Sequence, residues 1–245
     1  MEKKFKMKKY QAFTLMEMII VMALIFVVFL AFVSVLTAMM RSSNTVSARM
    51  VCRQEGEYIS EVFRKFIRNA SYESIRVYRR NNPSITFEAD DERVNYSNVL
   101  DISPSNPTTL GGAGGSGGTE IHYRPSANPR EVVCMGFFQD TATERGYIIR
   151  SKVTYTDHWS AYNPNSCFNP GNDEFRKNFM ILNSDLVHIE EFSIAFSAGG
   201  LNNYYTFEIE MEPQLGVGGY SNYIDTNLPN YIKTFVVQTR AYKSW

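Results

Sequence analysis

The strongest pattern along the chain is one long apolar run near the N-terminus. No charged side chain occurs from Met18 to Met40, where Leu, Ile, Val, Met and Phe dominate. As a helix, this run would be roughly 35 Å long, which exceeds the roughly 30 Å of a bilayer's hydrocarbon core. No later segment is comparable in length and hydrophobicity. The run therefore predicts a single membrane-spanning helix over about residues 18–40.

The helical pattern continues beyond the apolar run, because apolar residues keep the i, i+3, i+4 spacing and no proline occurs before Pro83. These apolar positions are Val51, Tyr58, Ile59, Val62, Phe63, Phe66, Ile67 and Ala70. We expect one helix over residues 13–72, whose first part spans the membrane and whose second part packs against a head.

Beyond Ser74 the pattern changes to short β-type runs separated by turn-rich stretches. The predicted strands are Ile85–Glu88, Glu120–Arg124, Glu131–Phe138, Tyr147–Tyr155, Val187–Phe196, Tyr204–Glu212 and Tyr231–Tyr242. We expect an α+β fold in which residues 73–245 form a β-rich head, with one antiparallel sheet region lying against the long helix.

Three long loops interrupt the predicted strands. The glycine-rich stretch Gly111–Gly118 has no lysine and no helical pattern after it, which excludes a phosphate-binding loop and predicts a flexible connection between strands. The other two loops cover residues 163–172 and 216–229. Loops on a rigid scaffold are where specific binding would occur.

The formal net charge is zero, with 25 basic and 25 acidic residues. Residues 1–12 hold five lysines against Glu2, so the remainder has 25 − 5 = 20 basic and 25 − 1 = 24 acidic residues. This mildly acidic body argues against nucleic acid as a partner. Basic residues are concentrated before the apolar run, which predicts a cytoplasmic N-terminus and an exported C-terminal body.

A specific motif precedes the apolar run. Lys8-Lys9-Tyr10-Gln11-Ala12 is followed by Phe13-Thr14-Leu15-Met16-Glu17, and this segment resembles the prepilin leader and cleavage motif of the type IV pilin-like family. The resemblance implies that a prepilin peptidase removes residues 1–12 by cutting between Ala12 and Phe13, and that it N-methylates Phe13. Two departures from the family pattern are Ala12 in place of the usual glycine and the lack of a proline in the apolar segment.

Glu17 is a carboxylate at the edge of the apolar run. Ionisable groups within a membrane span are costly and usually have a partner. The pilin resemblance implies one, because Glu17 would neutralise the N-terminal amine of an adjacent subunit and thereby set the register of assembly. The alternative interpretation is an uncleaved signal anchor in which Glu17 lies at the cytoplasmic interface, where water reaches it.

Three cysteines occur, and two of them fall in the predicted head. Exported proteins can form disulfides, so Cys134 and Cys167 are a candidate pair, although spacing alone leaves two free thiols as an alternative. Cys52 lies on the predicted helix and is expected to be a packing residue. A bridge from Cys52 to one of the others is the competing pairing.

The sequence gives little support for catalysis or metal binding. His122, His158 and His188 are scattered, without the spacing of known metal motifs, and no nucleophile motif is present. Some pseudopilins hold calcium in a C-terminal region, but the spacing of Asp225 and Asn227 is too weak to predict a site. We expect no enzyme activity, no metal and no cofactor.

The leading hypothesis is a structural subunit, either a minor pilin of a type IV pilus or a pseudopilin of a type II secretion system. Its implied partners are other pilins or pseudopilins, the prepilin peptidase, an inner-membrane assembly platform and membrane lipid. The head is large beside typical major pilins, and a bulky head packs poorly in a repetitive shaft, which favours a tip or initiating role. The Leu182–Phe196 stretch and the final Val-rich strand resemble the larger minor pilins and the J-type pseudopilins more than the major subunits. The alternative is a membrane-tethered binding or enzymatic domain with an uncleaved anchor.

Overall fold

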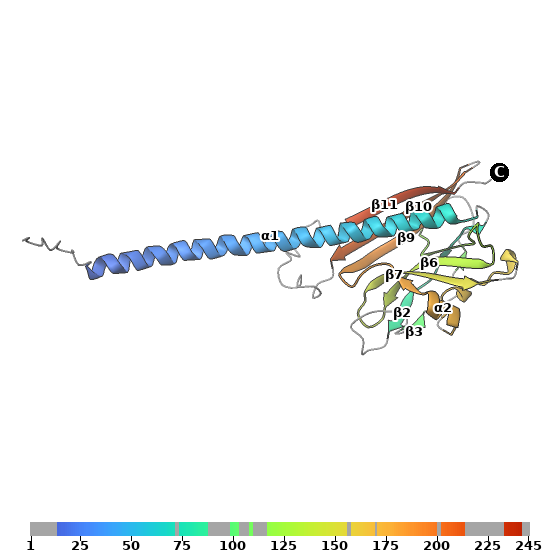
Figure 1. The fold of residues 1–245 in the computed structure, drawn as a ribbon, viewed down its shortest axis with the longest axis horizontal. Coiled ribbons are helices and arrows are strands. Elements are labelled where there is room, and N and C mark those ends of the chain that lie inside the picture. Colours follow the sequence, from blue (N-terminus) through green and yellow to red (C-terminus); the bar gives the residue numbers. More distant parts are fainter. Residues whose placement is uncertain are drawn as a thin grey trace, which may run out of the picture.

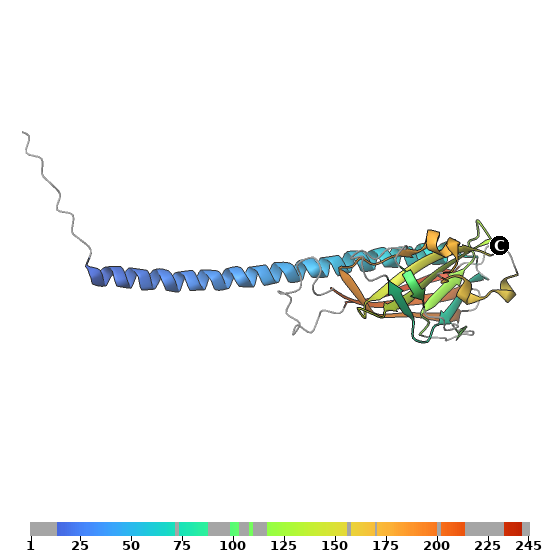
Figure 2. The same ribbon diagram turned by 90° about the horizontal axis from the view of Figure 1, so that it is seen from below.

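The computed structural model describes residues 14–71, 74–87, 99–102, 108–109, 117–155, 158–169, 171–199, 202–213 and 233–241. The long helix α1, Leu15–Asn69, projects from a β-rich head that lies along only its C-terminal part (Figures 1 and 2). Among the described residues, α1 contains the segment long and apolar enough to cross a membrane, and none of that segment is buried by the described part of the head. The predicted α+β architecture is therefore confirmed.

The C-terminal part of α1 packs through one face into the head. Its buried residues Cys52, Ile59, Phe63 and Phe66 follow helical spacing. The ring of Phe63 stacks on that of Phe207, with centroids 4.8 Å apart. Burial of such large apolar side chains, each worth about 1.5–3 kcal/mol, fixes the head on the helix.

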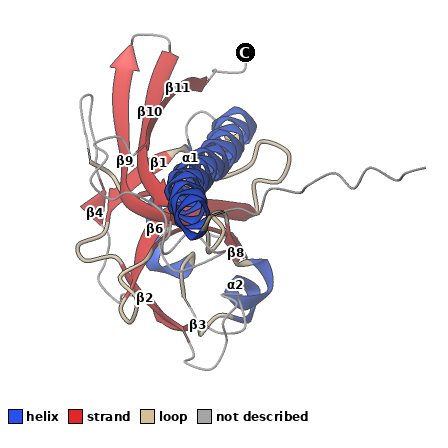
Figure 3. Ribbon diagram, turned by 90° about the vertical axis from the view of Figure 1, so that its left-hand side faces the viewer, coloured by secondary structure: helices blue, strands red, loops and turns tan. Residues whose placement is uncertain are grey.

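Two sheets make up the head (Figure 3). The larger sheet has the order β3-β2-β6-β5-β1-β4, with β7 pairing β6 and β8 pairing β7. Its strands are β1 Arg76–Arg79, β2 Ser84–Phe87, β3 Val99–Ile102, β4 Thr108–Thr109, β5 Glu120–Tyr123, β6 Glu131–Asp140, β7 Gly146–Thr154 and β8 Met180–Ile181. The smaller sheet contains β9 Val187–Gly199, β10 Asn202–Pro213 and β11 Lys233–Ala241, with β10 in the middle.

The expectation of one sheet region was wrong, because the described part of the head has two sheets. The strand pairs within them are antiparallel, as expected, except that β2 pairs with β6 in parallel. The physical reason lies in β6, whose residues Val132, Val133, Cys134 and Met135 are all buried. Alternate residues of a strand point to opposite faces, so this run buries both faces of the larger sheet. One face packs toward α1 and the smaller sheet, and the other carries a second core.

The second core is covered by the segment after β7. That segment contains two short 3-10 helices, Trp159–Ala161 and Pro164–Ser166, and the helix α2, Asp173–Asn178. Tyr162, Cys167 and Phe168 are buried in it beneath these elements. The predicted loop over residues 163–172 is thus a packed cover of the sheet, apart from Pro170, which lies outside the described residues.

The head has two ends along α1. We call the end beside Gln54, Glu55 and Tyr58 of α1 the proximal end, because it is the nearer to the apolar segment. The distal end is where Ala70, the C-cap of α1, bridges to Pro125 in the turn between β5 and β6. About 15 residues of helix separate Glu55 from Ala70, which corresponds to about 22 Å along the axis.

Buried hydrogen bonds and close packing fix the proximal end. Asn183 accepts from the Ile148 N–H at 2.9 Å, and its Nδ2 donates to the Gly146 and Val187 carbonyls at 3.2 and 3.3 Å. A Cβ at Gly146 would lie 2.0 Å from the Ile189 carbonyl oxygen. The close approach of β7 to β9 therefore requires glycine at this position.

Candidate assembly site and buried network of the head

The N-terminus of α1 is capped by the residues of the motif. Thr14 is the N-cap, and both its backbone N–H and its hydroxyl donate to Glu17 Oε2 at 2.9 Å. The Glu17 N–H in turn donates to Thr14 Oγ1 at 3.4 Å, which completes a capping box. In a single chain, the Glu17 carboxylate is thus held at the first turn of the helix and remains exposed to the surroundings.

This geometry places Glu17 beside the predicted cleavage point. Ala12 and Phe13 lie outside the described residues, so cleavage between them stays a prediction. Thr14 is the residue after Phe13, and its N–H contacts the Glu17 carboxylate directly. Cleavage would create an amine at Phe13, one residue before the Thr14 N–H that contacts this carboxylate. In the structure this carboxylate caps its own helix, and its contact with an amine of a neighbouring chain stays a prediction.

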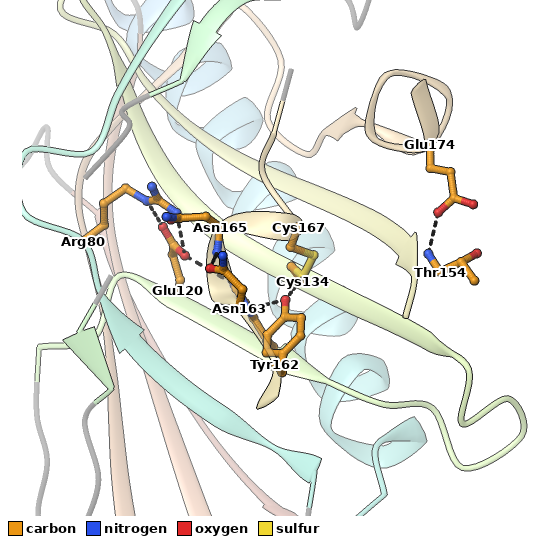
Figure 4. Close-up of a disulfide and its surroundings, with 10 residues drawn as sticks. Arg80, Glu120, Cys134, Thr154, Tyr162, Asn163, Asn165, Cys167 and Glu174 are labelled. Carbon is orange, nitrogen blue, oxygen red and sulfur yellow. Dashed lines mark hydrogen bonds and ion pairs between the residues drawn. A yellow bond between two sulfur atoms is a disulfide. The ribbon is translucent and has the colours of Figure 1, made fainter. Parts of the chain in front are cut away.

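The two head cysteines meet in the second core. Cys134 on β6 and Cys167 after the second 3-10 helix are joined in the structure as a disulfide, with their Cα atoms 6.4 Å apart (Figure 4). Both are fully buried. Cys52, on α1, is buried and takes no part in a disulfide among the described residues. Formation of the Cys134–Cys167 bond in the exported protein stays a prediction, because it depends on the oxidising compartment.

A buried polar network lies beside this disulfide (Figure 4). Arg80, Glu120 and His122 are at most 2% exposed, and the Arg80 guanidinium is ion-paired with the Glu120 carboxylate. His122 Nε2 lies 3.3 Å from Glu120 Oε2, and His122 Nδ1 lies 3.0 Å from the hydroxyl of Tyr162. Cys134 Sγ lies 3.7 Å from that hydroxyl. Through the contact of Tyr162 with His122, the network joins the larger sheet to the segment after β7 that covers it. The disulfide connects the same segment to β6.

The protonation states within the network follow from its surroundings. Burial alone would raise the pKa of Glu120, but the hydrogen bonds and charges of His122 and Arg80 outweigh it and lower that pKa. Burial lowers the pKa of His122, with Glu120 opposing this effect in part. Burial also raises the pKa of Tyr162 well above its ordinary value. Tyr162 therefore donates its hydroxyl proton to Nδ1 of a neutral His122, and Glu120 is an anion.

We expect the head to lose stability as the pH falls below 6.5, the ordinary pKa of His122. In that range His122 is protonated in the unfolded chain and neutral in the folded head. The free energy of unfolding then falls by up to about 1.4 kcal/mol per pH unit until the folded group also protonates. Below 4.5, the ordinary pKa of Glu120, the contribution of its ion pair declines as well.

Thermal unfolding of the detergent-solubilised full chain between pH 8 and pH 5 measures this effect. A His122→Gln variant serves as the comparison, since it removes the titrating group while keeping a polar side chain. The variant should be less stable at pH 8 and show a shallower pH dependence below 6.5. An equal slope in both proteins would contradict the role given to His122.

The structure also brings together a group that sequence spacing does not suggest. His188, Glu190 and Glu212 lie close enough at the proximal end to hold a metal ion. However, His188 Nδ1 accepts the Gly146 N–H at 3.0 Å, so Nε2 of the neutral ring carries the proton and points to Glu190 Oε2, 3.1 Å away. A metal at Nε2 would need an imidazolate, so this arrangement favours a hydrogen-bonded pair over a metal site.

The other residues considered from the sequence are dispersed. His158 is exposed near the cover, far along the chain from the proximal cluster. Asp225 and Asn227 lie outside the described residues, as do residues 111–116 of the glycine-rich stretch. The network around Glu120 could not have been found from spacing, since Arg80, Glu120 and Tyr162 carry no local motif and meet only through strand pairing and the cover.

Comparison with known proteins bears on the N-terminal segment alone. Residues 7–33 match the family model described as the prokaryotic N-terminal methylation motif. No curated protein matches the chain, and no solved structure does. The chain thus carries, directly before and within its exposed apolar helix, the motif that is the hallmark of type IV pilins and pseudopilins.

Proposed function

We propose that the chain is a minor pilin or pseudopilin, a structural subunit that assembles through α1 into a type IV pilus or a type II secretion pseudopilus. The observation that carries this proposal is the methylation motif over residues 7–33, joined to an apolar helix segment that no described part of the head buries. A segment of this kind is stable only in lipid or against other apolar helices. Other pilin-type subunits provide those helices.

In this proposal, the leader remains cytoplasmic and the head is exported. Prepilin peptidase cuts between Ala12 and Phe13 and methylates Phe13, and an inner-membrane platform then moves the subunit from the bilayer into the filament. Glu17 is the assembly residue, because its carboxylate is exposed at the first turn of α1. The chain acts in structure and not in catalysis, and no cofactor is part of the proposal.

The size of the head favours a position at the tip or in the initiating complex. The described part of the head has two sheets (Figure 3), and a second core lies on the face of the larger sheet that does not contact α1. A bulky head limits how closely identical subunits can pack around a shaft. A subunit at the start of the filament is free of this restriction on its outer side.

The competing function is a membrane-tethered binding or enzymatic domain that keeps its anchor. Recovery of partners separates the two proposals. Affinity-tagged full chain, extracted in mild detergent from cells that make a pilus or secretion system, should recover pilin-type proteins. A version whose residues 18–40 are replaced by an unrelated apolar helix is the control and should lose them. Equal recovery from both would favour a tether.

A further inference from the structure

One exposed stripe of α1 stays uncharged from the apolar segment up to the head. Its positions follow one another at intervals of three or four residues, and each of them is exposed. Because a helix turns once about every 3.6 residues, positions with this spacing lie along one side. We call them the uncharged stripe, which consists of Ile25, Phe29, Phe32, Leu36, Met40, Ser43, Ser47, Met50, Gln54 and Tyr58. From Met40 to Tyr58, the stripe continues for about 27 Å beyond the apolar run.

The neighbouring exposed flank of α1 has a different character at the same level. Arg53 pairs there with Glu57 at 2.7 Å, and Arg68 pairs with Glu61 at 3.3 Å. These ion pairs are exposed, as is typical of a helix face in water. We call this side the charged flank, and it consists of Arg49, Arg53, Glu57, Glu61, Arg64 and Arg68. The uncharged stripe therefore differs from a solvated helix face.

Large apolar side chains remain exposed where the uncharged stripe meets the head. Beyond Met40, the large apolar side chains that are exposed within the described part of the chain are Val46, Met50, Tyr58, Met180 and Val236. The first three lie on α1, and Met180 directly precedes Ile181. Ile181, Leu182 and Tyr58 help to line a groove of about 500 Å³ between α1 and the segment after β8. Exposed apolar patches of this kind are typical of interaction sites.

We propose that the uncharged stripe is the side of α1 that binds the N-terminal helix of a different pilin-type subunit, and that side chains of this neighbour enter the groove beside Tyr58. This inference rests on the proposed function, because it needs a neighbour whose helix also extends out of the bilayer. It goes further by assigning the side of α1 on which that neighbour lies.

The part of the stripe beyond the membrane carries this assignment. Within the bilayer, apolar side chains suit lipid and protein neighbours equally, so the apolar segment alone does not indicate a side. Beyond Met40 an uncovered helix face would be in water, where polar and charged side chains are favoured. Met50 and Tyr58 are on the stripe in this region, and they are 57% and 49% exposed. A neighbouring helix that leaves the bilayer beside α1 would cover them.

The shape of the stripe suits a second helix. Ser43 and Ser47 are small, and small residues let two helices approach closely. Within the apolar segment, a shallow hollow on α1 is lined by Ile25, Phe29 and Phe32 of the stripe, together with neighbouring apolar residues. Side chains of a second helix can pack into such hollows between the ridges of the first. The stripe thus offers packing positions both inside and outside the membrane.

The remaining sides of α1 are consistent with one neighbour outside the membrane. The head covers one side through residues such as Ile59 and Phe63, and the charged flank remains in water. The stripe lies between them and is available to a neighbouring helix. A subunit at the start of a filament, present in few copies, meets different pilin-type subunits and not a series of its own copies. We therefore assign the stripe to a different subunit.

Photocrosslinking of the full chain, in cells that make a pilus or secretion system, tests the proposal. A benzophenone amino acid replaces Met50 on the uncharged stripe or, as the matched control, Arg49, which is exposed at the same level on the charged flank. The probe at Met50 should crosslink to the N-terminal helix of another protein that carries an N-terminal methylation motif. The probe at Arg49 should give at least threefold less of this product. Mass spectrometry of the crosslinked peptides identifies the partner.

Met50→Asp should lower the recovery of pilin-type proteins with the full chain at least threefold, because it places a charge on the stripe. Arg49→Asp makes a larger charge change and introduces the same side chain into the helix one position away, yet it should leave recovery unchanged. Both positions are exposed, so neither substitution alters the core of the head.

Three results would overturn the stripe as the binding side while the unaltered chain still recovers pilin-type proteins. These are equal crosslinking from Met50 and Arg49, a crosslink from Met50 to a second copy of this chain in place of another protein, and unchanged recovery with Met50→Asp. If the unaltered chain recovers no pilin-type protein, the proposed function itself is overturned.

Discussion

Replacing Glu17 with alanine should leave membrane insertion intact and lower incorporation into filaments more than about tenfold. The substitution makes the segment more apolar, so the helix still inserts. It also removes the partner of a neighbouring N-terminal amine, and leaving one charge of a buried pair alone costs about 3–5 kcal/mol. For a minor subunit, the loss should appear as fewer or shorter filaments, measured by filament counts and by recovery of partner pilins at matched membrane levels.

Glu17→Gln separates the capping role that the structure shows for this side chain from its proposed role in assembly. A glutamine can still accept hydrogen bonds from the Thr14 N–H and hydroxyl, as Glu17 does, but it has no charge. If intersubunit charge pairing is decisive, Glu17→Gln should fail like Glu17→Ala. If the capping box alone matters, Glu17→Gln should behave like the unaltered chain, and that outcome would contradict the assembly role. Glu57→Ala, at an exposed position of α1, is the remote control.

Loss of the Cys134–Cys167 bond should cause the largest drop in head stability. The bond closes a loop with a sequence separation of 33, and the chain-entropy relation gives about 3–4 kcal/mol for a loop of this size. The cost should exceed this value, because the cover that contains Cys167 and Tyr162 also shields the Arg80–Glu120 pair. The variant Cys134→Ala with Cys167→Ala is compared with the unaltered chain by thermal unfolding.

Peptide mapping without reduction provides the direct check of the bond. Alkylation of the unfolded, non-reduced protein should label Cys52 alone, and one crosslinked peptide should contain Cys134 and Cys167. Cys52→Ala is the matched control, since Cys52 is also buried but unbridged. Its loss should leave the crosslinked peptide in place. Recovery of Cys134 and Cys167 as labelled thiols would refute the prediction.

The long helix was predictable because its signals are local. The uncharged run from Met18 to Met40 and the spacing of apolar residues up to Ala70 define a helix directly, and the structure places α1 at Leu15–Asn69. The longer strands, such as β6 and β10, were also found close to their observed bounds. In contrast, β1 is only four residues long and begins and ends with arginine, so it has no apolar run to reveal it.

The pairing of the strands was harder to predict from the sequence, because it joins residues that are far apart along the chain. The parallel contact of β2 with β6 and the separation of β9, β10 and β11 into a sheet of their own depend on which faces are buried. The unbroken apolar run in β6 was the available signal for burial on both faces. The Arg80–Glu120–His122 network gives no such signal in the sequence, since its residues come together only when the sheet forms.

Mass spectrometry of the N-terminal peptide, taken from the chain in both membrane and sheared filament fractions, tests the central claim most directly. The account predicts that the filament fraction contains only chains that begin with N-methylated Phe13. The uncut form, which begins at Met1, should remain in the membrane and accumulate when prepilin peptidase is absent. A mature N-terminus at Met1 in the filament fraction, or cleavage beyond Val35, would contradict the account.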